Sequence, residues 1–256
     1  MDVLVCVKRV PVTGGRISLT EDEQDIDTRY LGFTVSPHEE CAVEESVRLV
    51  EALGGSSTVL TLGPAAAEEQ LRDAMAMGAN RAVLLEAEGP EWDGGATAAA
   101  IARVIADHRD AGIAYDLLLF GNESADAGGY QVGVRVAHLL DLPCVTGVKQ
   151  LEILDGTAVA RREGPGGFEI FEIPLPAVIA VKEGINLPRY PSIPGRLRAK
   201  KAPVERIQPE RAEPGLEKLR LRLPQGREKQ VEILGDGAAG VERVVEMLRQ
   251  IGVMPS

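Results

Sequence analysis

The stretch YDLLLFGNESADAGGYQVGVRVAHLL, residues 115–140, joins three different sequence patterns. An apolar run stops at Gly121, small and acidic residues follow, and apolar residues return at helical spacing after Gln131. A short continuous apolar run is typical of a strand buried on both faces, and a 3.6-residue apolar period is typical of a helix. The segment therefore predicts a strand, a turn and a helix, which is the repeating unit of an α/β fold.

The same unit occurs three more times in the preceding residues. Apolar runs at 2–8, 57–63 and 81–87 are each followed by a helical pattern. The first of these helices begins at a capping box, with Ser36 three residues before Glu39, and ends at two glycines. Strands and helices alternating over the first ~145 residues predict an open, mainly parallel sheet with helices on both faces, a Rossmann-like α/β fold.

The pattern changes after Pro143. CVTGV is a candidate fifth strand, and four short strand patterns separated by turns follow it between 149 and 184, which we interpret as an antiparallel hairpin extension. The proline-rich stretch 185–203 shows no periodicity and is expected to be an exposed excursion. Residues 204–256 read as a charged C-terminal arm that ends in an amphipathic helix, which either docks on a partner or packs on its own domain.

The composition of the chain argues against two functional classes, nucleic-acid-binding proteins and membrane-spanning proteins. The chain has 256 residues, 45% of them hydrophobic, and a formal net charge of -11. A net-acidic chain is not typical of a nucleic-acid-binding protein. No apolar run reaches the ~18 residues that span a bilayer, so we expect no membrane insertion. The three cysteines are scattered, which favours a reducing, cytoplasmic compartment.

Motifs for catalysis and metal binding are absent from the sequence. The three histidines are far apart, and there is no nucleophile elbow or H-E-x-x-H. The turn after Gly121 matches neither G-x-G-x-x-G nor a Walker loop. We therefore expect no catalytic residue and no metal site. Cys6 lies within an apolar strand and is expected in the core, and His38 is expected on the surface near the strand ends. Lys200 and Lys201 are expected to belong to a solvated basic face.

A ligand site is expected at the carboxyl ends of the parallel strands. Gly121 permits a tight turn and a close approach by a ligand. The residues after it, up to Gly129, are expected to present backbone N–H groups at the start of a helix, where a phosphate binds. Alternatively, Ser124 or Asp126 simply caps that helix. Glu123 and Asp126 would repel a di- or triphosphate, so a monophosphate or ribose hydroxyls are easier to hold.

Four stretches carry a resemblance to a known family. They are VLVCVKRVP (3–11), SPHEECAVEESVRLVE (36–51), AMAMGANRAVLL (74–85) and PAVIAVKEGINLPRYPSIPGRLRAKK (176–201), of which the last is the most specific. Together they resemble the β subunit of electron transfer flavoprotein. The resemblance covers residues 1–203, which it identifies as a nucleotide-binding domain with a partner-docking loop at 184–202.

The resemblance implies a heterodimer in which an α subunit holds most of an FAD and the β subunit also binds AMP. The AMP cleft implied for this chain comprises Cys6, Ser36, Leu62, Gly121, Asn122, Glu123, Ser124, Asp126, Gly128, Gly129, Tyr130, Gln131 and Val132. Thr13 and His38 match positions at the flavin edge, where the family often has aromatic residues. The family docks on acyl-CoA dehydrogenases and similar flavoenzymes, and the matching positions here are Ile193, Pro194, Lys200 and Lys201.

Departures from the family's pattern leave two alternatives. Many members read G-K-Q-A-I-D-D-D-x-N-Q-x-G at the AMP loop, and this chain keeps Asp126, Gln131 and Gly133 of it. Flavin-bifurcating, NADH-linked members hold a second FAD instead of AMP, and this chain shares Q-V-G with them but lacks their threonine and proline. The other alternative is a stand-alone nucleotide-binding or stress-sensor domain, which would leave the docking loop without a role.

Overall fold

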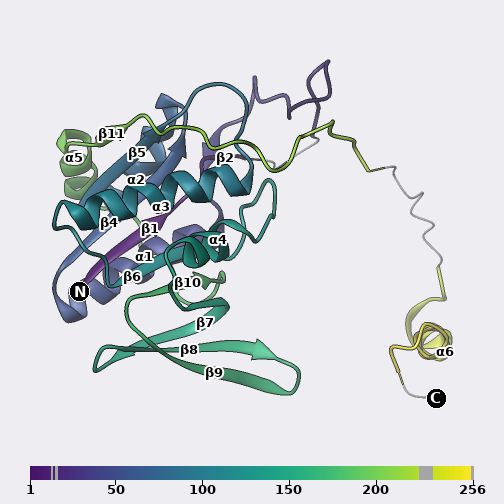
Figure 1. Ribbon diagram of the computed structural model, residues 1–256. Coiled ribbons are helices and arrows are strands. Elements are labelled where there is room, and N and C mark those ends of the chain that lie inside the picture. Colours follow the sequence, from purple (N-terminus) through teal and green to yellow (C-terminus); the bar gives the residue numbers. More distant parts are fainter. Residues whose placement is uncertain (13, 15–16, 225–232, 255–256) are drawn as a thin grey trace.

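The computed structural model describes residues 1–12, 14, 17–224 and 233–254, and a nine-stranded sheet forms its centre (Figure 1). The strand order is β11-β5-β4-β1-β6-β10-β7-β8-β9, and neighbours are parallel from β11 to β7 and antiparallel from β7 to β9. The bounds are β1 Asp2–Cys6, β4 Ser56–Gly63, β5 Arg81–Glu86, β6 Leu117–Gly121, β7 Cys144–Leu154, β8 Thr157–Gly164, β9 Gly167–Pro174, β10 Ala177–Val181 and β11 Glu205–Ile207. Two short strands, β2 Val10–Pro11 and β3 Phe33–Thr34, pair separately.

Helices cover both faces of the sheet, as the alternating pattern predicts. Helices α1 (Pro37–Leu53) and α2 (Glu68–Met77) share one apolar core with Val3 and Val5 of β1. Helices α3 (Gly94–Asp110) and α4 (Val132–Leu139) share the other core with Leu4 and Cys6. Because successive residues of β1 enter opposite cores, the strand has to be apolar throughout. The predicted α/β fold with helices on both faces is confirmed.

The position of β10 corrects one expectation from the sequence. Its residues were expected to form a hairpin strand, but β10 is parallel to both β6 and β7 and lies between them. All five of its residues are buried, as an interior parallel strand requires and a solvent-facing hairpin strand does not. Strand β7 contains both CVTGV and the segment after it, with register shifts in its pairing with β10 and β8, and Gly147 takes φ 72° within it.

The proline-rich stretch is less irregular than expected, because Ile193–Lys201 forms helix α5. The Ser192 side chain caps it by accepting a hydrogen bond from the Gly195 amide. The helix packs closely on α2, since a Cβ on Gly195 would lie 2.5 Å from the Ala76 carbonyl oxygen. The C-terminal segment starts by extending the sheet as β11 and ends in α6 (Val241–Gln250), preceded by the short helix η2 (Gly237–Gly240). Figure 1 shows α6 away from the sheet, and none of its residues is buried.

The strand order locates the crevice of the fold. From β1 the chain moves outward through β4 and β5, and then returns to the opposite side of β1 as β6. The connections after β1 and β6 therefore leave in different directions, which opens a crevice outside their carboxyl ends. Among the described helices, none is long and apolar enough to cross a membrane.

Candidate functional site

The first turn of α1 and the turn after β6 meet at this crevice. A Cβ on Gly121 would lie 2.6 Å from Glu39 Cγ, 3.1 Å from the Glu39 amide nitrogen and 3.2 Å from His38 Cβ. The Ser36 hydroxyl donates a hydrogen bond of 3.2 Å to the Glu123 carbonyl oxygen. Glycine at 121 therefore has a cause that the sequence did not reveal, which is the close approach of α1.

The capping box of α1 also ties the helix to β1. The Glu39 carboxylate accepts the Ser36 amide at 3.0 Å, as the sequence predicts, and accepts the Lys8 amide at 3.0 Å on its other oxygen. Glu39 is buried, and burial raises its pKa to about 7 although both amides act to lower it. This side chain thus joins the two elements that border the crevice.

Lys8 spans the crevice from the end of β1. Its Nζ lies 2.6 Å from Asp126 Oδ2 and also pairs with the Glu91 carboxylate, which comes from the β5–α3 loop. Burial lowers the pKa of Lys8, but the two carboxylates outweigh it and raise the pKa overall. No local pattern in the sequence singles out Lys8, so its role in holding Asp126 was not predicted.

The start of α4 contradicts the alternative that Ser124 or Asp126 caps this helix. Helix α4 begins at Val132, its N-cap is Gln131, and no side chain makes a capping hydrogen bond there. The residues from 122 to 131 form a separate turn, in which the Gly128 amide donates to the Ser124 carbonyl oxygen. An uncapped helix start leaves its first amides available to an anion. The helix start with free amides therefore lies several residues after the position that the sequence suggested.

His38 also differs from its expectation as a surface residue. Its side chain is only 16% exposed, and its Nδ1 accepts the Glu183 amide at 2.7 Å. Its Nε2 lies 3.1 Å from Glu123 Oε1. Because Nδ1 is the acceptor, the neutral ring carries its proton on Nε2, the nitrogen that lies close to Glu123. His38 therefore fixes the turn after β6 to the end of β10.

The other residues of the predicted cleft differ from one another in burial and contacts. Cys6 is buried in the core, as expected, and burial raises the pKa of its thiol. Leu62 packs against the same core. The Asn122 side chain accepts the Gly147 amide at 2.8 Å and so braces β7, whereas Tyr130 is 58% exposed with φ 54°. Thr13 lies outside the described residues.

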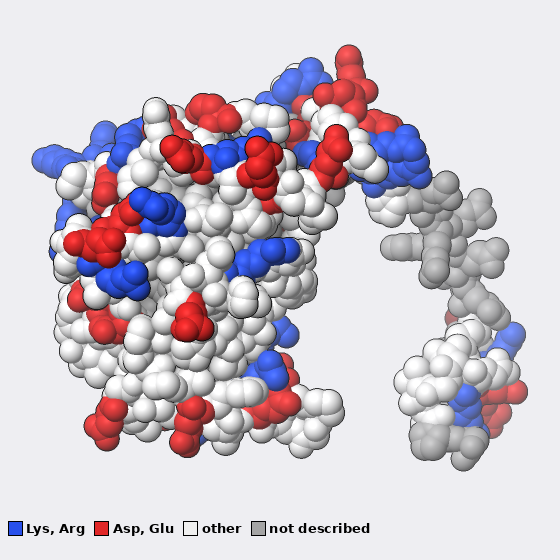
Figure 2. All heavy atoms as spheres, in the orientation of Figure 1, with Lys and Arg blue, Asp and Glu red and all other residues white. Residues whose placement is uncertain are grey.

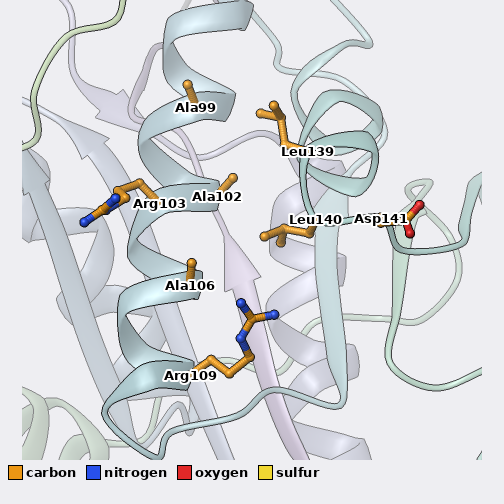
Figure 3. Close-up of a pocket in the computed structure, with 8 residues that line it drawn as sticks. All are labelled: Ala99, Ala102, Arg103, Ala106, Arg109, Leu139, Leu140 and Asp141. Atoms are coloured by element: carbon orange, nitrogen blue, oxygen red, sulfur yellow. The ribbon is translucent and has the colours of Figure 1, made fainter.

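A hollow of about 430 Å³ lies elsewhere, between α3 and the end of α4 (Figure 3). It follows the C-terminal half of α3, which lies toward the amino ends of the strands. Its lining is Ala99, Ala102, Arg103, Ala106, Arg109, Leu139, Leu140 and Asp141. None of these residues belongs to the predicted cleft, so the hollow is not the strand-end crevice.

The predicted docking residues lie together on α5. Ile193 is the first residue of this helix and is 77% exposed, and Pro194 follows it. Lys200 and Lys201 are exposed in its last turn, and basic side chains gather over α5 at the upper left of Figure 2. An exposed apolar residue beside a basic rim is typical of a surface that binds a partner. Arg189, which pairs with two glutamates of α1 close to this surface, was not singled out from the sequence.

Comparisons with known proteins identify the family. Residues 25–212 match the family model described as "Electron transfer flavoprotein domain". The chain is 35% identical to an electron transfer flavoprotein subunit beta of Bacillus subtilis, over 97% of this chain and 98% of that protein. The chain belongs to the electron transfer flavoprotein β-subunit family. Similar subunits of Syntrophomonas wolfei, 32% identical over 97% of this chain and 96% of that protein, and of Mycobacterium bovis, 36% identical over 79% and 77%, agree with this assignment.

Membership of this family gives the chain a role in electron transfer, as a flavoprotein subunit, and it implies an α-subunit partner. The resemblance found in the sequence is thereby confirmed at the level of the family.

Proposed function

We propose that this chain is the β subunit of a heterodimeric electron transfer flavoprotein that passes electrons from flavin dehydrogenases through an FAD held mainly by the α subunit. We further propose that it binds AMP in the crevice between β1 and β6. The observation that carries the proposal is the convergence of the α1 start, the turn after β6 and the uncapped start of α4 at the switch point of the sheet.

The residues of the crevice fit a nucleoside monophosphate. The two acids that would repel a phosphate are already engaged, Asp126 by Lys8 and Glu123 by His38. The uncapped amides at Val132 and beyond suit one phosphate group. The turn before them is open, because a Cβ on Gly129 would meet nothing within 4 Å. These features support AMP, with the phosphate held at α4 and the cleft residues around it.

FAD, when bound, supplies the acceptance and release of electrons, and this chain's residues position it. Thr13 and His38 are the proposed flavin-edge residues. His38 is suited to orient a neighbour because the Glu183 amide on Nδ1 and the Glu123 carboxylate beside Nε2 fix its ring plane. The C-terminal arm is proposed to cross to the α subunit, since α6 carries an apolar stripe and the described chain buries none of its residues.

Partner dehydrogenases, of the acyl-CoA dehydrogenase type, are proposed to dock on α5. Ile193 is the anchor, Pro194 stiffens the start of the helix, and Lys200 and Lys201 steer an acidic partner.

Expression with and without the α subunit tests the proposal. The chain should carry FAD only when co-purified with its α subunit, and the heterodimer should accept electrons from an acyl-CoA dehydrogenase supplied with its acyl-CoA. A full complement of tightly bound FAD on the isolated chain would refute the shared-flavin proposal.

A further inference from the structure

The segment between β10 and α5 is fastened to one side of α1 by polar contacts. Asn186 Nδ2 donates to the Cys41 carbonyl oxygen at 3.0 Å and to Glu45 Oε2 at 2.8 Å. Arg48 Nη2 donates to the Leu187 carbonyl oxygen at 3.4 Å. The three α1 residues are spaced so that they lie on one side of the helix. A loop rich in proline is thus held along a helix by its backbone and by its asparagine.

Arg189 makes five hydrogen bonds to two glutamates of α1. Its guanidinium donates to both carboxylate oxygens of Glu44, at 2.9 and 3.2 Å, and to both of Glu51, at 2.6 and 2.8 Å. Its backbone amide adds a bond of 3.1 Å to Glu44. Glu44 is 2% exposed, so one partner of the arginine is buried. Two hydrogen bonds from a planar guanidinium to one carboxylate fix the orientation of the two groups as well as their separation, whereas a lysine ammonium fixes only the separation.

The fastened loop and the helix α5 that follows it expose apolar side chains. Leu187 is 82% exposed, Tyr190 96%, Ile193 77% and Leu197 60%. Tyr190 follows Arg189 directly, and Ile193 follows it by four residues. On the other side, Arg72 of α2 donates to the Ala202 carbonyl oxygen at 3.3 Å, which holds the end of α5. The apolar surface is therefore held from both α1 and α2 before any partner arrives.

We infer that Arg189, clamped between Glu44 and Glu51, is the positioning residue of the docking surface and sets the place of Ile193 relative to α1. The inference rests on the proposed docking function and adds to it a residue that does not itself touch the partner. Ordering an interface loop on binding costs free energy, so a loop ordered in advance binds more tightly. The same helix begins at Ser36 beside the crevice, so one rigid element carries both the docking surface and one wall of the site.

The test uses the αβ heterodimer as electron acceptor of a purified acyl-CoA dehydrogenase at saturating acyl-CoA. Arg189→Lys keeps the charge but loses the fork, and Glu51→Gln removes only the exposed half of the clamp. Arg189→Lys should raise the KM for the heterodimer about tenfold and leave kcat and FAD content unchanged. Arg103→Gln, which removes an exposed arginine on α3, is the control and should leave the KM unchanged.

A double-mutant cycle with Ile193→Ala separates positioning from general destabilisation. If Arg189 acts by placing Ile193, Arg189→Lys should add little to the KM of the Ile193→Ala variant. Fully additive effects, or a wild-type KM in both Arg189→Lys and Glu51→Gln, would overturn the inference.

Hydrogen exchange distinguishes failure of the clamp from failure of the docking proposal. Amides of residues 184–192 should exchange faster in Arg189→Lys, while those of α1 stay protected. If Ile193→Ala alone leaves the KM unchanged, the docking surface is misassigned, and faster loop exchange would still show that Arg189 positions the loop. Unchanged loop exchange in both clamp variants would refute the clamp itself.

Discussion

Adding one methyl group at Gly121 should separate the two halves of the crevice. In Gly121→Ala the new Cβ would lie 2.6 Å from Glu39 Cγ, a distance that real Cβ atoms essentially never show, and 3.1 Å from the Glu39 amide nitrogen. Glu39 cannot swing aside freely because its carboxylate holds the Ser36 and Lys8 amides. Either α1 shifts outward or the capping box breaks.

Overpacking of this kind typically costs about 1–3 kcal/mol. A loss of about 2 kcal/mol corresponds to a drop in Tm of roughly 4–8 °C for a chain of this size. Because the shift moves α1 away from the turn after β6, the AMP proposed to bind here should be lost as well.

The assay is thermal unfolding of the purified protein together with its nucleotide content, and Gly129→Ala is the steric control for the Tm alone. A Cβ at Gly129 would meet nothing within 4 Å, so its Tm should change by less than about 1 °C. A wild-type Tm and wild-type AMP content in Gly121→Ala would refute the reasoning, since they would show that α1 does not press on Gly121.

Three further predictions concern single side chains. Burial raises the pKa of Glu39 to about 7, so between pH 4.5 and 7 the folded chain keeps a proton that the unfolded chain releases. The free energy of unfolding should therefore fall as the pH rises from 4.5 to 7. Glu39→Gln should flatten that part of a urea-unfolding profile measured against pH. Lys8→Met frees Asp126 at the crevice and should weaken AMP retention about tenfold on dialysis, whereas unchanged retention would show that the pair has no part in binding. Ile193→Ala should raise the KM for a dehydrogenase by roughly 30-fold, equivalent to about 2 kcal/mol, with flavin content unchanged; identical transfer kinetics would remove Ile193 as the anchor.

The strands and helices of the sheet domain follow from local signals. The apolar run before Gly121 and the capping box at Ser36 mark their elements in the sequence, and the structure has the same elements. The place of β10 could not be predicted, because an apolar run tells that a strand is buried on both faces but not which strands flank it. Helix α5 was missed because its prolines lie before and at its first turn, where they are tolerated.

The sequence predicted where the candidate site lies, but it did not predict which side chains contact one another there. Strand ends are visible in the sequence, so Gly121 and the turn after it could be located. The pairs formed by Lys8 and His38 join residues far apart in the chain, and no local pattern encodes them. The same holds for Arg189, whose partners on α1 are identifiable only once the loop is seen to lie along that helix.

The nucleotide content of the heterodimer tests the central proposal most directly. The chain would be co-expressed with its α subunit, the complex purified and denatured, and the released nucleotides separated and counted. One FAD and one AMP per heterodimer are expected for a plain electron carrier with AMP at the Gly121 turn. Two FAD and no AMP would contradict the proposal, and would instead indicate a flavin-bifurcating complex with a second flavin in this crevice.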